Sequence, residues 1–239
     1  MRANALLQAG KLDEAIDALG AELRDNPADA QRRTFLFELL CFAGKYDRAE
    51  KQLDVLAQGG RQAEMGALLY RSALHAERTR QEMFERERFP ADTGVTDALS
   101  GTLNGAPFHS IRDADQRIGA RLEVFAAGQY MWLPFEHIAS IRMEPPKQLR
   151  DLMWARAIVR TGPSFRGLEL GEVLVPVLTP LAWQDDDPSV RLGRVTEWYA
   201  LPDGTPVPVG QKLLLTDGQE TSILELRELA IAAVPAAAS

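Results

Sequence analysis

Apolar positions in the first part of the chain recur with the period of an α-helix. Leu12, Ile16 and Leu19 lie at i, i+4 and i+7, a spacing that places them on one face of a helix. A similar apolar face returns within residues 46–53, and residues 62–87 form one longer pattern of the same kind. These positions predict a run of amphipathic helices that pack against one another over residues 1–88.

The same region contains an internal repeat. Residues 6–15 recur as residues 40–49 at an offset of 34 positions, with Gly10 matching Gly44. This offset is the period of the tetratricopeptide repeat, a pair of antiparallel helices, and the glycine suits the sharp turn between them. We therefore expect two repeat units and a third, degenerate unit formed by the helix over 62–87. An unrelated helical bundle is the alternative.

A repeat of this kind predicts a binding surface. Stacked helix pairs leave a concave groove, lined mostly by the first helix of each pair, and such grooves bind peptides or helices of other proteins. The repeat register places the following residues on this surface: Gln31, Thr34, Glu38, Cys41, Met65, Leu68 and Ser72. We expect them to contact a partner. The alternative for each of them is that it is packed in the core of the helical part.

The period changes after the repeats. Residues 89–94 interrupt the helical pattern, and beyond them short β-prone runs alternate with turn signals. Strands are predicted at 121–125, 129–133, 138–143, 152–160, 173–178, 195–199, 212–216 and 221–229. The dipeptides Ala127-Gly128 and Asp217-Gly218 predict hairpins. A βαβ alternation is missing, so we expect an antiparallel sheet, barrel-like or strongly curled, rather than a parallel nucleotide-binding sheet.

The predicted fold class is therefore α+β, a tetratricopeptide-like α-α superhelix followed by a mainly antiparallel β-rich domain. The chain of 239 residues is long enough for two modest domains with a sizeable buried core. The expected boundaries are a helical repeat domain at 1–88, a linker at 89–107, the β-rich domain at 108–231 and a flexible tail at 232–239.

Composition narrows the classes of partner. The chain has 46% hydrophobic and 26% charged residues and a formal net charge of −7, without a block of Lys or Arg. Such a chain is repelled by nucleic acid and by anionic membrane surfaces, so neither is an expected partner. No apolar run approaches the roughly 20 residues of a membrane-spanning helix. Charges scattered over residues 1–23 are unlike a signal peptide, and the single cysteine, Cys41, forms no internal disulfide, so we expect a cytoplasmic protein.

Motifs that carry known chemistry are missing from the sequence. Phosphate-binding loops of the GxGxxG and GxxxxGK[ST] types do not occur, and Ser110 and Ser164 lack the GxSxG setting of a serine nucleophile. The histidines lack the spacing of metal ligands. Asp113 with Asp115, and the acidic run 185–187, are expected to be paired or solvated loop charges rather than a cation site. We therefore expect no enzymatic activity, no metal and no cofactor.

The second part carries an ordered set of longer motifs. They are FHSIRDAD at 108–115, YMWLPFE at 130–136, PPKQLRDLMW at 145–154, GEVLVPVL at 171–178, RLGRVTEW at 191–198 and GQK at 210–212. Together with the repeats, this set resembles the ImpE family, whose members are also called SciE-type virulence proteins or TagJ. The resemblance implies an accessory protein of the bacterial type VI secretion system, acting as a non-enzymatic adaptor in the cytoplasm.

The resemblance also implies a partner. Family members bind the N-terminal helix of the small sheath subunit, a TssB-like protein, and influence how the ATPase ClpV disassembles the contracted sheath. We therefore expect an amphipathic helix that lies in a groove. Because Trp and Arg are common anchors of interfaces, further candidates are Trp132, Arg150, Trp154, Arg194 and Trp198; the alternative is that the tryptophans fill the sheet core. The helical groove is the first expected binding surface and the cleft between the two parts the second.

Two other functions stay open at this point. One is an enzyme or small-ligand-binding protein with a deep, polar-lined pocket around Trp132, Glu136 and Arg150. The other is a repeat scaffold that serves a different assembly. The sequence leaves the oligomeric state open.

Overall fold

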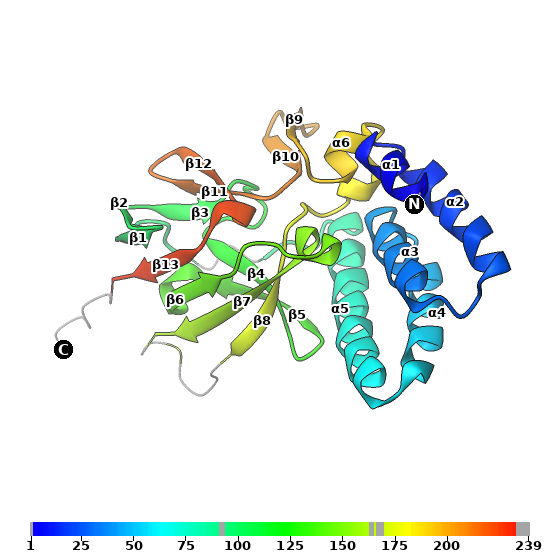
Figure 1. Cartoon of the computed structure of the whole chain (residues 1–239). Coiled ribbons are helices and arrows are strands. Elements are labelled where there is room, and N and C mark those ends of the chain that lie inside the picture. Colours follow the sequence, from blue (N-terminus) through cyan, green and yellow to red (C-terminus); the bar gives the residue numbers. More distant parts are fainter. Residues whose placement is uncertain (1, 91–93, 163–164, 166–169, 233–239) are drawn as a thin grey trace.

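A helical part and a β-rich part lie side by side in the molecule (Figure 1). The computed structural model describes residues 2–90, 94–162, 165 and 170–232. Helices occupy one side of this structure and an antiparallel sheet occupies the other. The predicted α+β class is therefore confirmed, with helical repeats first and the sheet after them.

The helical part has the predicted paired organisation. Its helices are α1 (Arg2–Gln8), α2 (Leu12–Asp25), α3 (Ala30–Phe42), α4 (Tyr46–Leu56) and α5 (Arg61–Glu85), with a 3-10 turn η1 (Ala57–Gly59) before α5. Gly10 and Gly44 lie at equivalent turns, with φ of 78° and 65°, a conformation that favours a residue without a Cβ. Helices α1–α2 and α3–α4 are the two predicted repeat units, and α5 is the long third helix.

The largest sheet is open. Its strand order is β2-β1-β13-β6-β7-β8-β4-β5, so β2 and β5 lie at its two edges and the described residues form no closed barrel. All neighbouring strands are antiparallel. The strands are β1 (Gly101–Leu103), β2 (Ala106–Phe108), β4 (Arg121–Ala126), β5 (Gln129–Pro134), β6 (Ile138–Met143), β7 (Trp154–Thr161), β8 (Gly171–Pro176) and β13 (Glu228–Ile231).

Two smaller sheets and several short helices complete the β-rich part. One sheet has the order β12-β11-β3 and the other pairs β10 with β9. Their bounds are β3 (Ile111–Asp113), β11 (Leu213–Thr216), β12 (Gln219–Ser222), β9 (Thr196–Ala200) and β10 (Pro206–Gly210). The short helices are η2 (Phe135–His137), η3 (Leu149–Leu152), η4 (Ala182–Gln184), α6 (Pro188–Arg191) and η5 (Ile223–Glu225).

The predicted hairpins form, and one predicted strand is divided. Strands β4 and β5 flank Ala127-Gly128, and β11 and β12 flank Asp217-Gly218. Asp217 and Gly218 have φ of 50° and 82°, as a tight two-residue hairpin turn requires. The single strand expected at 221–229 is instead the end of β12, then η5, then the start of β13.

The hydrophobic core joins the two parts. One cluster of buried side chains spans all of α1 to α5 and includes Phe125, Met153, Trp154 and Leu174 from the β-rich part. A second cluster lies within the β-rich part. Because the first cluster takes side chains from both parts, the helices pack directly on the sheet.

The expected boundaries differ in detail from the structure. Strand β1 and the first residues of β2 lie within 89–107, where a linker was expected, because β1 pairs with β13 of the main sheet. Most of the expected tail, from residue 233 onward, lies outside the described residues. Within the described part of the chain, none of the helices combines the length and the apolar character needed to cross a bilayer.

Candidate functional site

The inner face of the repeats is covered by the chain's own β-rich part. Phe37 of α3 and Tyr70 of α5 pack around Trp154 of β7, with ring centroids 6.5 Å and 6.3 Å from that of Trp154. Phe37 and Tyr70 also contact each other at 5.8 Å. Trp154 is only 2% exposed. This aromatic cluster therefore occupies space that a partner peptide would take in an isolated repeat.

A polar contact closes the same face. The guanidinium of Arg150 in η3 donates to the carboxylate of Glu38 on α3 at 2.8 Å and lies over the Tyr70 ring at 5.1 Å. Burial raises the pKa of Glu38, and Arg150 opposes that effect. Burial also raises the pKa of the neighbouring Cys41 thiol. Glu38 and Cys41 thus lie on the side of α3 that is covered by η3 and β7 of the same chain.

A buried network of charges fixes the helices to the sheet. Arg80 of α5 donates to both carboxylate oxygens of Glu123 on β4, at 2.7 and 2.9 Å. It also donates to Glu77 at 3.1 Å, and Glu77 accepts from the indole of Trp154 at 2.8 Å. Lys212 also forms an ion pair with Glu123. These contacts hold α5 in one position against the sheet.

The electrostatics of this network match a structural role. Burial acts against the charged form of Glu123, but Arg80 and Lys212 outweigh it and hold the pKa of that carboxyl well below its ordinary value. Burial raises the pKa of Asp113, the second partner of Lys212, to about 6. Burial and the nearby Glu123 carboxylate raise the pKa of Tyr130 above its ordinary value. Every charge of the cluster has an opposite partner, as buried charges require.

An exposed apolar strip runs along α5. Met65, Leu68 and Leu69 are 65%, 63% and 42% exposed, and with Ser72 they follow the spacing i, i+3, i+4 and i+7 of one helix face. We call Met65, Leu68 and Leu69 the α5 strip. A group of large apolar side chains that faces solvent is typical of an interaction site.

The α5 strip borders a groove between α5 and the sheet. This hollow has a volume of ≈ 370 Å³. We call it the α5 groove, and it is lined by Leu69, Ser72, Ala73, Phe125, Ala127, Gly128, Glu172, Val173 and Leu174. These residues come from α5, the β4–β5 hairpin and β8, which lie beside one another (Figure 1).

The sheet extends the apolar surface beyond the α5 groove. Ile158 of β7 is 51% exposed and lies opposite Glu172 of β8 in the ladder. Trp154 and Ile158 are four residues apart on β7, so their side chains lie on the same face of the sheet. Trp154 packs against the helices, and Ile158 therefore lies on the helix-facing side as well. Arg156 and Glu172 form an exposed ion pair at 3.9 Å. The site therefore combines an apolar floor with a polar rim, as protein interfaces do.

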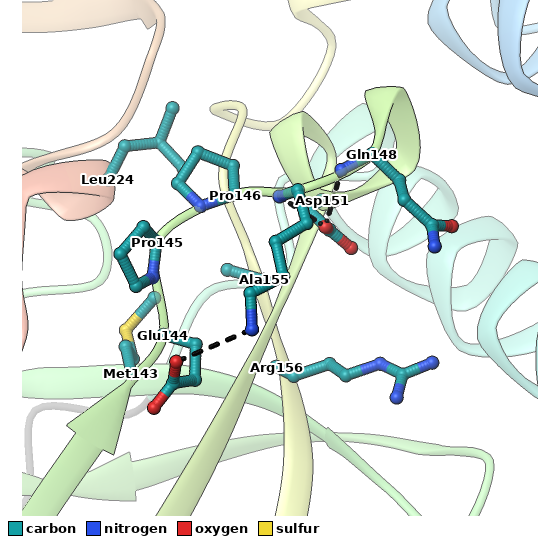
Figure 2. Close-up of a pocket in the computed structure, with 10 residues that line it drawn as sticks. Met143, Glu144, Pro145, Pro146, Gln148, Asp151, Ala155, Arg156 and Leu224 are labelled. Carbon is teal, nitrogen blue, oxygen red and sulfur yellow. Dashed lines mark hydrogen bonds and ion pairs between the residues drawn. The ribbon is translucent and has the colours of Figure 1, made fainter.

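A second hollow is formed by the motif at residues 144–151 (Figure 2). Its volume is ≈ 250 Å³. Figure 2 shows Pro145 and Pro146 on one side, and the Asp151 carboxylate accepts from the backbone N–H groups of Lys147 and Gln148 at 2.8 and 2.9 Å. These contacts fix the loop and occupy the Asp151 carboxylate.

The predicted site residues separate into distinct locations. Met65, Leu68 and Ser72 lie on one face of α5, at or beside the α5 groove. Gln31 is exposed at the start of α3, and Thr34 is half-buried and donates to the carbonyl of its own helix at Ala30.

The candidates in the β-rich part are held by internal contacts. Trp132 donates to the hydroxyl of Tyr130 at 2.5 Å. Arg194 donates to the backbone carbonyls of Leu7 and Gln8, at the end of α1, at 2.6 and 3.1 Å. The pocket suggested by Trp132, Glu136 and Arg150 does not form as one cluster, because Trp132 contacts the Tyr130 side and Arg150 contacts α3.

Some residues of the groove were not identified from the sequence. Leu69 carries a detectable signal, because it is one helical turn after Met65 and continues the same face. Phe125, Leu174 and Ile158 read only as strand residues, and their position beside α5 depends on how the two parts pack.

The described residues contain no cluster of His, Cys, Asp and Glu that could hold a metal ion. Asp113 pairs with Lys212, and Asp115 pairs with Arg117 at 2.7 Å. In the acidic run, Asp187 caps α6 by accepting from the N–H of Ser189 at 2.7 Å.

Comparison with known proteins agrees with these features. The model of the ImpE protein family matches residues 105–230, and the tetratricopeptide repeat model matches residues 6–71. The type VI secretion system accessory component TagJ of Pseudomonas aeruginosa is 33% identical over 262 residues, covering 96% of this chain and 90% of that protein. The crystal structure of protein VPA1032 from Vibrio parahaemolyticus has the same fold, with a TM-score of 0.84 at 21% identity over 97% of this chain and 98% of that one. The chain belongs to the ImpE family.

Proposed function

We propose that this protein is a non-enzymatic adaptor of a type VI secretion system that binds the N-terminal helix of a TssB-like sheath subunit in the α5 groove. Through that contact it influences disassembly of the sheath by the ClpV ATPase. The family membership and the name of the Pseudomonas aeruginosa relative support the secretion-system role. The adaptor acts in the bacterial cytoplasm, where the sheath is recycled.

The exposed α5 strip is the observation that carries this proposal. Met65 and Leu68 are each more than 60% exposed beside a hollow with an apolar floor. Full burial of one such side chain contributes about 1.5–3 kcal/mol. An amphipathic helix that covers the strip and inserts a side chain toward Phe125 and Leu174 gains this burial and makes the helix-in-groove contact.

The concave face of the repeats is a weaker choice. There Glu38 is bound to Arg150 and the aromatic cluster around Trp154 fills the space. A partner helix would have to displace η3 and β7 from this face. The α5 groove needs no such rearrangement, because its apolar side chains already face solvent.

The test is calorimetry with a synthetic peptide of the sheath subunit's first helix. Leu68→Glu places a charge in the apolar contact, so we expect the Kd to rise at least about tenfold. The matched control is Val195→Glu, a substitution at a 40% exposed apolar residue directly before β9 that does not line the α5 groove. We expect this control to bind like the wild type.

Two results would contradict the proposal. One is a peptide affinity that Leu68→Glu leaves unchanged, which would move the binding site away from α5. The other is the lack of any binding heat for the wild-type protein at high peptide concentration, which would remove the sheath subunit as the partner.

A further inference from the structure

The β9–β10 hairpin lies at the upper edge of the molecule in Figure 1, beside α6. Two hydrogen bonds, one at each end of the hairpin, show which backbone groups of β9 point toward β10. The N–H of Leu201 donates to the carbonyl of Thr205 at 2.9 Å, and the N–H of Gln211 donates to the carbonyl of Val195 at 3.4 Å. Bonded pairs alternate along an antiparallel ladder, so the odd-numbered residues of 195–201 bond to β10.

The even-numbered residues of β9 form its outer edge. The N–H and C=O groups of Thr196, Trp198 and Ala200 point away from β10 because of this alternation. In the part of the chain that the structure describes, β9 pairs with β10 alone. The outer edge of β9 is therefore open to another strand.

The other edge of the hairpin is closed. Pro206 and Pro208 occupy the equivalent outward positions of β10 and have no N–H to donate. At the third outward position, Gly210 donates to the hydroxyl of Thr179 at 2.9 Å and accepts from the N–H of Thr179 at 2.8 Å. The hairpin thus protects one edge and leaves the other unprotected.

Aromatic side chains accompany the open edge. Trp198 and Tyr199 are 42% and 46% exposed, on opposite faces of the strand. Exposed aromatic side chains of this size are enriched in protein interfaces, and they flank the position that an added strand would take.

Acidic side chains gather on the Tyr199 face. The Tyr199 hydroxyl donates to Asp185 at 2.9 Å. That hydrogen bond raises the pKa of Tyr199, and the charges of Glu197 and Asp187 add to the effect. Asp186 is exposed between the other two aspartates.

The nearest arginines along the chain are engaged elsewhere. Arg191 forms an ion pair with Asp13 of α2 at 3.3 Å. Arg194 donates to the carbonyls of Leu7 and Gln8 at the end of α1. The acidic charge beside β9 is therefore left for a cationic partner.

We propose that the outer edge of β9 binds an extended, basic segment of a partner protein, which adds a third strand to the β9–β10 sheet. Backbone bonds to Thr196, Trp198 and Ala200 supply affinity, and Lys or Arg side chains beside Glu197 and Tyr199 supply specificity. A second copy of this chain is disfavoured, because its own β9 would bring Glu197 and the flanking aspartates against like charges. This surface is separate from the α5 groove, and its test is independent of the function proposed above.

The probe is a short peptide of alternating Lys and Val, compared with the same peptide carrying Glu in place of Lys. Binding is followed by the shifts and the hydrogen exchange of backbone amides in NMR spectra of the full chain. We expect the basic peptide to bind at least about tenfold more tightly than the acidic one. It should slow exchange at the Trp198 amide, and leave the amide of Tyr199, already bonded to β10, unchanged.

Two variants separate the edge from the charge. Ala200→Pro removes one outward N–H and should weaken binding of the basic peptide, whereas Ala200→Ser should not. Glu197→Lys leaves the outward backbone groups of β9 intact and should also weaken binding of the basic peptide. This variant therefore tests the proposal even where Ala200→Pro fails to fold. Equal affinity for the two peptides, or an unprotected Trp198 amide at saturation, would overturn the proposal. So would a dimer in sedimentation measurements that Ala200→Pro abolishes.

Discussion

Replacing Arg80 with Met removes the cation that connects helix α5 to the sheet. The Arg80 side chain is 1% exposed and Glu123 is fully buried. Arg80 donates four hydrogen bonds, two to Glu123, one to Glu77 and one to the carbonyl of Leu178. Met fills much of the same volume without a charge, so the substitution tests the ion pair rather than the packing.

The expected cost follows from the burial of these groups. Removing one partner of a buried ion pair costs about 3–5 kcal/mol. Without Arg80 the buried Glu77 carboxylate loses its cation, and Glu123 keeps only Lys212. Total stabilities of domains are about 5–15 kcal/mol, so Arg80→Met should lose a large part of the free energy of unfolding. The matched control is Arg78→Met on the same helix, whose pairs with Asp47 and Glu50 are partly exposed. Pairs of that kind contribute about 0–1 kcal/mol.

Urea denaturation followed by circular dichroism and by tryptophan fluorescence measures both variants. In the wild type the two signals should change together, because helices and sheet share one core. Arg80→Met should shift the midpoint strongly and Arg78→Met only slightly. Equal costs for the two substitutions, or separate transitions of helices and sheet in the wild type, would refute the idea that the buried network holds the two parts together.

Two further predictions concern the turn residue Gly44 and the effect of pH. Gly44→Ala should lower the free energy of unfolding by about 2 kcal/mol or more in urea denaturation, because φ is 65° and a Cβ would clash with the Trp183 indole; Gly20→Ala, with open space in α2, should not destabilise. The pKa of Glu123 is held below its ordinary 4.5 in the folded protein. The ionised Glu123 carboxylate therefore stabilises the fold at pH values above 4.5, and this stabilisation is lost progressively as the pH falls below 4.5. Urea denaturation at pH 5 and pH 3 should therefore reveal a smaller acid loss in Glu123→Gln than in the wild type; an equal loss would contradict this. Asp113, with its pKa raised to about 6, acts with the opposite sign, and its contribution is lost as the pH rises through that value.

Local patterns in the sequence were sufficient for most of the elements. The helix period and the 34-residue offset predicted α2 to α5, and Asp217-Gly218 predicted the β11–β12 hairpin. These features depend on residues close together in the chain. Strands β1 and β2 were missed because each has only three residues. They pair with each other, and β1 also pairs with β13, which is distant in the sequence.

The site was harder to predict because it depends on packing between the two parts. The repeat pattern correctly predicts helices α3 and α5. Nothing in the sequence near Glu38, however, indicates that Arg150, 112 residues away, will bind it. The same holds for Arg80 and Glu123, which are 43 residues apart. A repeat pattern predicts a concave face, and only the tertiary structure determines whether the chain covers that face itself.

Site-specific photocrosslinking tests the central claim most directly. A benzophenone side chain is introduced at Leu69, in the α5 groove, or at Thr34, on α3, and each protein is irradiated with the peptide of the sheath subunit's first helix. We predict a covalent adduct with the peptide at position 69 and none at position 34. An adduct at position 34 without one at 69 would contradict the account and place the partner on the inner face of the repeats.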